Sequence, residues 1–234
     1  LPAYERPGHC MRYITRSVTG AGRNANHDSV AVLCEGGRGV FVIADGFAKP
    51  GSGQLSERFV RGVLTLYQQH IHQGVDDTEH AAVEKIVRSV MAQLHPTLFA
   101  HQIGSACYLI GVAAHGKLTL AYEGDCSCGV VTPAGTIEWM TPPHCKANWR
   151  RDRTHCELAQ DLARNRVTRC LKASHAPDPD FVFHPLAAGE RLVFATDGFW
   201  AELTQVQQSR LLTAPDSFFA PVDDDVTWID VQHL

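Results

Sequence analysis

Three apolar, strand-like runs of this chain each lead into an aspartate that stands beside a glycine. A fourth aspartate stands just before a further apolar run, at residues 226–229. Because a buried strand holds its end residue rigidly, several strand-end carboxylates that meet in one cleft would form a set of oxygen ligands, which hard divalent cations prefer. A single Asp-Gly pair is ordinary turn chemistry, so the prediction rests on the whole set. The four residues are Asp45, Asp125, Asp197 and Asp224.

Length and charge narrow the class of protein. The 234 residues are enough for one well-buried domain, or at most two small ones. The formal net charge of -4 gives no electrostatic reason to expect nucleic acid or an anionic membrane as a partner. No apolar stretch approaches the length of a membrane span, and residues 1–11 lack the apolar segment of a signal peptide. We therefore expect a cytoplasmic protein that binds neither nucleic acid nor membrane.

The eight cysteines admit disulfides, zinc ligands or free thiols. Cys34 and Cys107 lie in apolar strand-like runs, where a free cysteine behaves as a small hydrophobic side chain. Without a secretory signal, reduced thiols in the cytosol are the favoured interpretation. A zinc site would need ligands whose spacing fits no common zinc motif. Those candidates are Cys126, Cys128, His144, Cys145, His155 and Cys156.

Apolar periodicity predicts strands, two helices, further strands, a helix and a last strand. Thr78 is a plausible N-cap of the second helix. Hairpin connections imply antiparallel pairing, and helices segregated from antiparallel strands predict sheets covered by helices. The polar, Arg-rich residues 142–164 are expected to form a surface excursion with a short helix around residues 157–163. The predicted strands are 12–18, 29–35, a run ending at 45, 105–114, 117–124, 128–132, 136–140, 180–186, 191–197 and 226–231, and the predicted helices are 54–72, 78–94 and 204–212.

The loop between the first two predicted strands carries an arginine and an aspartate, Arg23 and Asp28. The planar fork of arginine binds two phosphate oxygens at once. Together with the strand-end aspartates, this loop outlines metal-assisted phosphate chemistry. Arginine and aspartate also occur on ordinary surface turns, so the loop is weak support by itself.

Seven short motifs follow one another along nearly the whole chain. They are Arg23 to Asp28, Ala44-Asp45-Gly46, Gly104-Ser105-Ala106, Gly124-Asp125-Cys126, Val167 to Leu171, Ala195 to Gly198, and Asp224 to Thr227. In this order and spacing the set resembles the metal-dependent protein phosphatase (PPM, type 2C) family, and the chain looks like a divergent, minimal bacterial-type member. Each motif alone is unspecific, so the resemblance rests on their order.

The resemblance implies an α+β fold, a four-layer α/β/β/α sandwich of two antiparallel sheets flanked by helices. Residues 1–234 would form a single catalytic domain, with a flap at about 142–164. The implied activity is that of a serine/threonine phosphoprotein phosphatase, which hydrolyses phosphate monoesters by attack of a water or hydroxide bridging two metal ions. The implied cofactors are two or three Mn²⁺ or Mg²⁺ ions. Phosphorylated proteins and a cognate serine/threonine kinase are the implied partners, and we expect a monomer.

The resemblance also implies roles for the expected metal ligands. Asp45 would bridge two metal ions, and the carbonyl of Gly46 would bind one of them. Asp197 and Asp224 would complete the protein ligands of the first metal. Asp125, together with Asp197, would bind a weaker third ion.

Four further residues have roles around these ligands. Arg23 would clamp the substrate phosphate, and Asp28 would orient metal-bound waters without binding a metal itself. His27 stands where the family has an acidic residue, and Asp225 stands where it has asparagine, so hydrogen bonding beside the metals would differ. Because every expected metal ligand is retained, an active enzyme is favoured. A catalytically weak pseudophosphatase acting as a regulatory binding module, or an enzyme for small phosphate esters, stays open.

Overall fold

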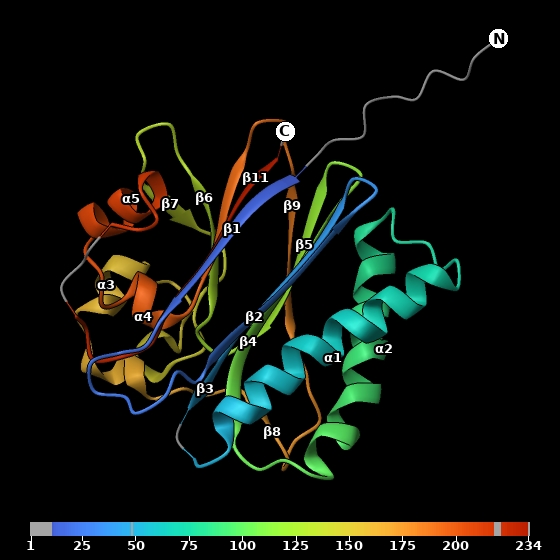
Figure 1. Cartoon of the computed structure of the whole chain (residues 1–234), viewed down its shortest axis with the longest axis horizontal. Helices are drawn as coiled ribbons and strands as arrows, with labels where there is room; N and C mark the ends of the chain where they lie inside the picture. The colour runs from blue at the N-terminus through green and yellow to red at the C-terminus, as the bar shows by residue number, and fades with distance from the viewer. Residues whose placement is uncertain (1–10, 48, 218–220, 234) are drawn as a thin grey trace.

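Two antiparallel β-sheets pack face to face at the centre of the protein (Figure 1). The computed structural model describes residues 11–47, 49–217 and 221–233. One sheet has the strand order β2-β3-β4-β5-β9, with β8 paired to β4, and the other has the order β1-β11-β10-β6-β7. The strands are β1 (Met11–Val18), β2 (Asp28–Glu35), β3 (Arg38–Phe47), β4 (Ser105–Ala114), β5 (Lys117–Glu123), β6 (Ser127–Val131), β7 (Ile137–Trp139), β8 (Leu171–Lys172), β9 (Asp180–Pro185), β10 (Arg191–Ala195) and β11 (Val226–His233).

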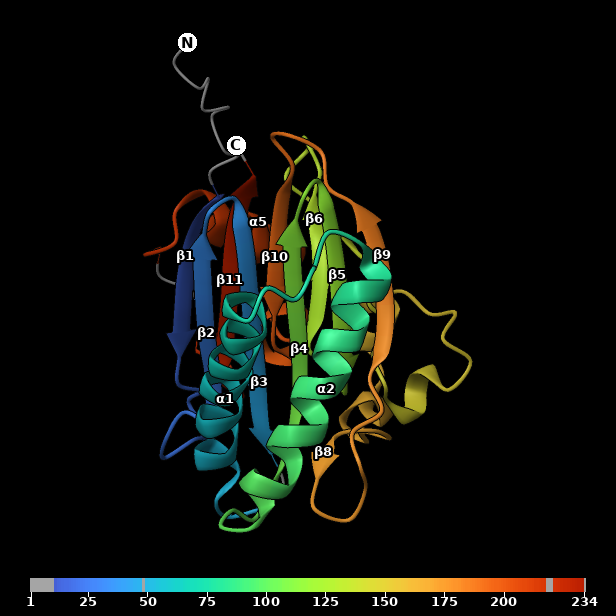
Figure 2. The same cartoon turned by 90° about the vertical axis from the view of Figure 1, so that its right-hand side faces the viewer.

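Helices cover the outer face of each sheet. Two long helices lie across the sheet that contains β2 to β5 and β9, as Figure 2 shows face-on. Two shorter helices, α4 and α5, pack on the other sheet. None of the described helices has both the length and the apolar character needed to cross a membrane. The helices are α1 (Ser52–His72), α2 (His80–Phe99), α3 (His155–Ala159), α4 (Asp197–Trp200) and α5 (Gln205–Thr213), with 3₁₀ turns η1 (Lys146–Asn148) and η2 (Leu162–Asn165).

Three apolar layers hold the sandwich together. The first, with Val42 and Phe59, lies between β3 and the α1–α2 pair. The second, with Phe41 and Phe194, lies between the two sheets. The third, with Trp228, lies between β11 and the helices α4 and α5. Burial on both faces explains why the central strands are almost continuously apolar. The predicted α+β four-layer sandwich is confirmed.

Several predicted boundaries were wrong. Strand β3 does not end at Asp45 but runs on to Phe47, because its pairing with β4 continues past the point where its pairing with β2 ends. Helix α2 starts at His80 rather than residue 78, and Thr78 hydrogen-bonds Asp76 instead of capping it. The same helix continues to Phe99, past the predicted end at residue 94, because its last turn still buries an apolar side chain in the first layer.

The start of α4 and the Arg-rich excursion also differ from expectation. Strand β10 ends at Ala195, so Asp197 is the first residue of α4 instead of the last residue of a strand. The predicted short helix around residues 157–163 is two separate turns, α3 and η2. Each turn begins with its own side-chain cap: Thr154 accepts from the main-chain N–H of residue 157, and Asp161 accepts from that of residue 163.

Candidate metal and phosphate site

The four strand-end aspartates come from both sheets and influence one another electrostatically. Asp45 lies on β3 and Asp125 follows β5, whereas Asp197 starts α4 and Asp224 precedes β11. Burial raises the pKa of Asp45 well above its usual range, and the charges of Asp28 and of the other three aspartates raise it further. A group of carboxylates that repel one another in this way is a place where positive charge is strongly stabilised.

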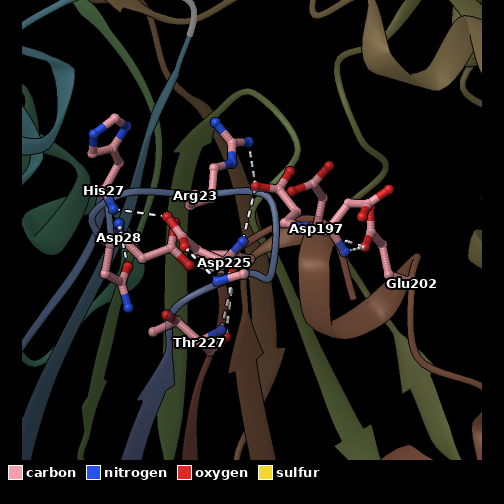
Figure 3. A network of polar contacts seen from close by, with 12 residues as sticks. Arg23, His27, Asp28, Asp197, Glu202, Asp225 and Thr227 are labelled. Atoms are coloured by element: carbon pink, nitrogen blue, oxygen red, sulfur yellow. Dashed lines mark hydrogen bonds and ion pairs between the residues drawn. The ribbon is translucent and has the colours of Figure 1, made fainter. Parts of the chain in front are cut away.

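Asp225 fastens the loop between β1 and β2 to the start of β11. Its carboxylate accepts hydrogen bonds from the main-chain N–H of Gly20 at 2.9 Å and of His27 at 2.7 Å (Figure 3). A β-carbon at Gly20 would lie 2.4 Å from the carbonyl oxygen of Asp223, so only glycine allows this approach. The loop that carries Arg23 is therefore held against the segment that carries Asp224.

Asp28 lies at the start of β2, directly across from Asp45 on β3. The hydroxyl of Thr196 donates a 2.9 Å hydrogen bond to its carboxylate. Burial raises the pKa of Asp28 to about 7, and hydrogen bonds from Thr227 and Thr196 oppose that rise. Asp28 thus links β2 to the residue that immediately precedes Asp197.

Arg23 extends from the β1–β2 loop and forms an ion pair with Asp224. Its side chain is 35% exposed and that of Asp224 is 25% exposed, so the guanidinium is reachable from solvent. The pKa of Arg23 is raised. Desolvation lowers it, but the charge of Asp224 and the hydrogen bond to Asp224 raise it by more. The arginine expected to bind phosphate and an aspartate expected to bind metal are therefore in direct contact.

Two further residues, Arg164 and Glu202, neighbour Asp197, a contact that the sequence did not predict for either of them. Arg164, on η2, places Nη1 3.0 Å from Oδ2 of Asp197 and Nη2 3.6 Å from Oε1 of Glu202. Glu202 in turn accepts hydrogen bonds from the main-chain N–H groups of Asp223 at 3.1 Å and Asp224 at 3.3 Å. Figure 3 shows Glu202 beside Asp197. No motif surrounds Glu202 in the sequence, so only the folded chain reveals this contact.

Asp125 is the most enclosed of the four aspartates. Asp125 is 5% exposed. Its Oδ1 is buried and has no hydrogen-bond partner in the part of the chain that the structure describes. Burial raises its pKa, while hydrogen bonding to the Cys107 thiol and the charge of Arg164 oppose the rise. The indole of Trp200 donates a 2.8 Å hydrogen bond to its main-chain carbonyl and fixes its position. A buried carboxylate oxygen without a partner is costly unless a cation or a proton reaches it.

Two glycines let chain segments approach closely around the aspartates. A β-carbon at Gly46 would lie 2.3 Å from the carbonyl oxygen of Ser52, and one at Gly198 would lie 2.0 Å from that of Asp225. The N–H of Gly46 donates a 3.1 Å hydrogen bond to the carbonyl of His27. The Asp-Gly pairs of the sequence therefore reflect tight packing between segments as well as turn geometry.

The side chain of His27 takes no part in this network. Its main-chain N–H binds Asp225, but its ring points away from Asp225 and Asp28 (Figure 3). The ring lies against the start of α1, where a β-carbon at Gly53 would be 2.9 Å from Cδ2 of His27. The imidazole makes no hydrogen bond to the described residues. The ring of His27 therefore does not replace the hydrogen bonding beside the metals that an acidic residue at this position would provide.

The cysteines and histidines considered for zinc have other partners. His144 accepts a hydrogen bond from the N–H of Gly124 at 3.0 Å and contacts Asp180 at 3.2 Å. His155 lies 2.7 Å from the hydroxyl of Ser127. Among the described cysteines, the four considered for zinc, Cys126, Cys128, Cys145 and Cys156, are free thiols. These contacts provide no zinc site.

The aspartate cluster suits hard divalent cations in chemistry, although no three described His, Cys, Asp or Glu side chains converge tightly enough to enclose a metal ion. Its donors are carboxylate oxygens, as Mg²⁺ and Mn²⁺ require. Arg23 and Arg164 hold two of the carboxylates, at Asp224 and Asp197. The unpartnered Oδ1 of Asp125 marks a position that a cation would satisfy. The residues therefore fit such cations in chemistry, provided that Arg23 gives way at Asp224.

The fold is similar to that of solved serine/threonine phosphatases. The S. agalactiae serine/threonine phosphatase aligns with a TM-score of 0.74 at 16% identity, over 96% of this chain and 100% of that one. MsPP of Mycobacterium smegmatis, a PPM Ser-Thr phosphatase in complex with cacodylate, gives 0.72 at 20%, over 97% and 99%. The PstP catalytic domain in complex with two manganese ions gives 0.68 at 17%, over 95% and 98%. No protein-family model and no curated protein sequence matches the chain. At these identities the similarity establishes the fold.

Proposed function

We propose that the protein is a metal-dependent serine/threonine phosphoprotein phosphatase of the PPM type, and that the chain is a single catalytic domain with residues 142–164 as a flap. The observation that carries this proposal is that four aspartates from both sheets lie close enough to influence one another electrostatically, and that one of them, Asp224, is paired with the solvent-reachable Arg23. The fold shared with bacterial serine/threonine phosphatases supports it. A regulatory module without catalysis would not require this complete set of carboxylates, so the enzyme is the favoured interpretation.

We assign the cofactor as Mn²⁺ or Mg²⁺, held by Asp45, Asp197 and Asp224, with Asp125 beside them. The neighbouring PstP structure, which contains two manganese ions, supports this assignment. When bound, such a cation acts as a Lewis acid and lowers the pKa of a coordinated water toward about 7. The buried, mutually repelling carboxylates provide the negative charge that would hold it.

The protein's own residues would orient the phosphate and the attacking water. Arg23 would leave Asp224 and bind two oxygens of the substrate phosphate with its planar guanidinium, which stabilises charge that grows in the transition state. Asp28, held by the Thr196 hydroxyl, would accept a hydrogen bond from the water and direct its lone pair toward phosphorus. Substrates of this site are proteins phosphorylated on serine or threonine, and a kinase must supply them.

Hydrolysis of an aryl phosphate and of a serine-phosphorylated peptide, with and without added Mn²⁺, tests the proposal. We expect turnover of both substrates with Mn²⁺ and none in EDTA. Asp45→Asn should abolish turnover of both. Binding of the phosphopeptide without any turnover would favour the pseudophosphatase instead. Turnover of the aryl phosphate alone would favour an enzyme for small phosphate esters.

A further inference from the structure

Arg164 is the most enclosed of the paired arginines in the Arg-rich excursion. Its side chain is 13% exposed, compared with 42% for Arg151 and 33% for Arg153. Its two acidic partners are also sheltered, since the side chain of Asp197 is 12% exposed and that of Glu202 is 21% exposed. The attraction within an ion pair so shielded from water is screened less than in a surface pair, and loss of one partner leaves a buried, uncompensated charge.

The position of Arg164 is fixed from two sides. The turn η2 that carries it is capped by Asp161, which also accepts a 2.6 Å hydrogen bond from Nη1 of Arg153. On the opposite side, the carboxylate of Glu202 accepts hydrogen bonds from the main-chain N–H groups of Asp223 and Asp224. The Arg164 guanidinium is thus built into the aspartate cluster and is not a mobile surface group.

The charge of Arg164 acts on two aspartates of the cluster. It directly pairs with Asp197 and works against the raised pKa of both Asp197 and Asp125. A third, weaker cation would require these same two carboxylates. A guanidinium and a metal ion cannot bind one carboxylate oxygen at the same time, so Oδ2 of Asp197 is available to one or the other.

We propose that Arg164 is an internal counter-ion that takes the place of a third divalent cation between Asp125 and Asp197. This inference rests on the proposed function, because it requires Asp197 and Asp125 to face metal ions. The chain then binds two cations, and a third binds only when Arg164 leaves Asp197. Arg164 acts on metal number through Asp197, so it is a positioning residue and not a catalytic one.

Counting Mn²⁺ ions directly tests the proposal. The stoichiometry and Kd of Mn²⁺ would be measured by calorimetry, and free Mn²⁺ by electron paramagnetic resonance, for the wild type and for Arg164→Gln. We expect two ions in the wild type and three in Arg164→Gln, with the third bound at least about ten-fold more tightly than any third ion in the wild type. Arg153→Gln is the matched control, since Arg153 pairs with Asp161 in the same excursion, and it should bind two ions.

A second readout does not depend on stoichiometry. Thermal unfolding in EDTA should show a lower Tm for Arg164→Gln than for Arg153→Gln, because Asp197 loses its counter-ion. Saturating Mn²⁺ should then raise the Tm of Arg164→Gln more than that of the wild type. If Arg164→Gln does not fold, Arg164→Lys keeps one charge without the fork and should bind the third ion more tightly than the wild type.

The outcomes separate this proposal from the proposed function. Two ions in the wild type and the same two in Arg164→Gln and Arg164→Lys would overturn the counter-ion role alone. Three ions in the wild type would also overturn it. If neither the wild type nor the variants bind Mn²⁺, the metal-dependent function fails, and the counter-ion proposal fails with it.

Discussion

The Arg23 guanidinium, on the loop between β1 and β2, is ion-paired with the carboxylate of Asp224, which precedes β11. The pair joins the residue we assign to phosphate with one that we assign to metal. A cation that binds Asp224 and a phosphate that binds Arg23 would each replace one half of this pair. Binding of the cation to Asp224 frees Arg23 and therefore favours binding of the phosphate. Binding of the phosphate to Arg23 in turn frees Asp224 and favours binding of the cation.

Arg23→Ala should raise KM and lower kcat, with kcat/KM reduced by roughly 10²-fold, because charge developing on the phosphate loses a partner. Arg23→Lys should not restore full activity, since lysine lacks the two-pronged fork. Steady-state kinetics with an aryl phosphate would measure this. Arg16→Ala is a control of matched exposure, 36% against 35%, in a surface pair with Asp216, and should behave as the wild type. Unchanged kinetics in Arg23→Ala would identify Arg23 as a surface residue.

Asp45→Asn should remove activity by on the order of 10²-fold or more and lose at least one bound Mn²⁺, because the charge shared between metal ions disappears. In EDTA the same variant should be more stable than the wild type, since burial and its neighbours make the Asp45 charge costly. Calorimetry and thermal unfolding would measure these two effects. Asp216→Asn, with a side chain 86% exposed, serves as the control. Full manganese-dependent turnover in Asp45→Asn would contradict its assignment.

The arginines of the proposed flap, residues 142–164, should differ in their effect on phosphopeptide turnover. Arg151 and Arg153 pair with Asp180 and Asp161, whereas Arg150 stacks at 4.7 Å over the ring of Trp149, which is 73% exposed. Arg150→Gln should therefore raise the KM of a phosphopeptide by a few-fold, roughly 3 to 10, and leave that of an aryl phosphate unchanged. Arg153→Gln should change neither. Equal effects of the two substitutions on both substrates would remove the flap from substrate selection.

Acid should weaken the fold partly through His155. Burial lowers the pKa of His155 to about 3, so the folded chain leaves it neutral while the unfolded chain protonates it as the pH falls through about 6.5. The free energy of unfolding then declines by about 1.4 kcal/mol per pH unit below pH 6.5, until the folded-state pKa is reached. The buried aspartates with raised pKa values act in the opposite direction, so variants must be compared pairwise.

Denaturant unfolding in EDTA at pH 7, 6 and 5 isolates this contribution. His155→Gln should be less stable than the wild type at pH 7, since its ring packs between Trp139 and Trp200. Between pH 7 and pH 5, the free energy of unfolding of His155→Gln should decrease less than that of the wild type. The exposed His72, changed to Gln, should leave the pH dependence unaltered. An identical decline in the wild type and His155→Gln would contradict the assigned cause.

Gly198→Ala should destabilise the protein by about 1 to 3 kcal/mol, because its β-carbon would lie 2.0 Å from the carbonyl oxygen of Asp225. Gly22→Ala is the matched control, since a β-carbon there meets its nearest atom at 3.4 Å, an ordinary contact. Denaturant midpoints of the two variants would measure the difference. Equal midpoints would show that the α4 start can shift without cost.

Local pattern alone was enough to predict most of the elements. Alternating and continuous apolar runs on either side of His115-Gly116 predicted the β4–β5 hairpin, which pairs as expected. The apolar stripe with Leu55 and Phe59 predicted α1 because 3.6-residue periodicity is a property of the sequence itself. Boundaries failed where a neighbouring strand or core decided them, as at Asp45 and Phe99.

The composition of the site was also predictable in part, because strand-end aspartates and Arg23 stand out beside apolar runs. Their pairing was not. That Arg23 meets Asp224, that Arg164 meets Asp197, and that the His27 ring turns away depends on segments far apart in the chain. The sequence determined which charged groups the protein has and which strands bear them. Only the tertiary structure decided which charges are buried together, because burial and distance, not residue type, set the strength of an ion pair.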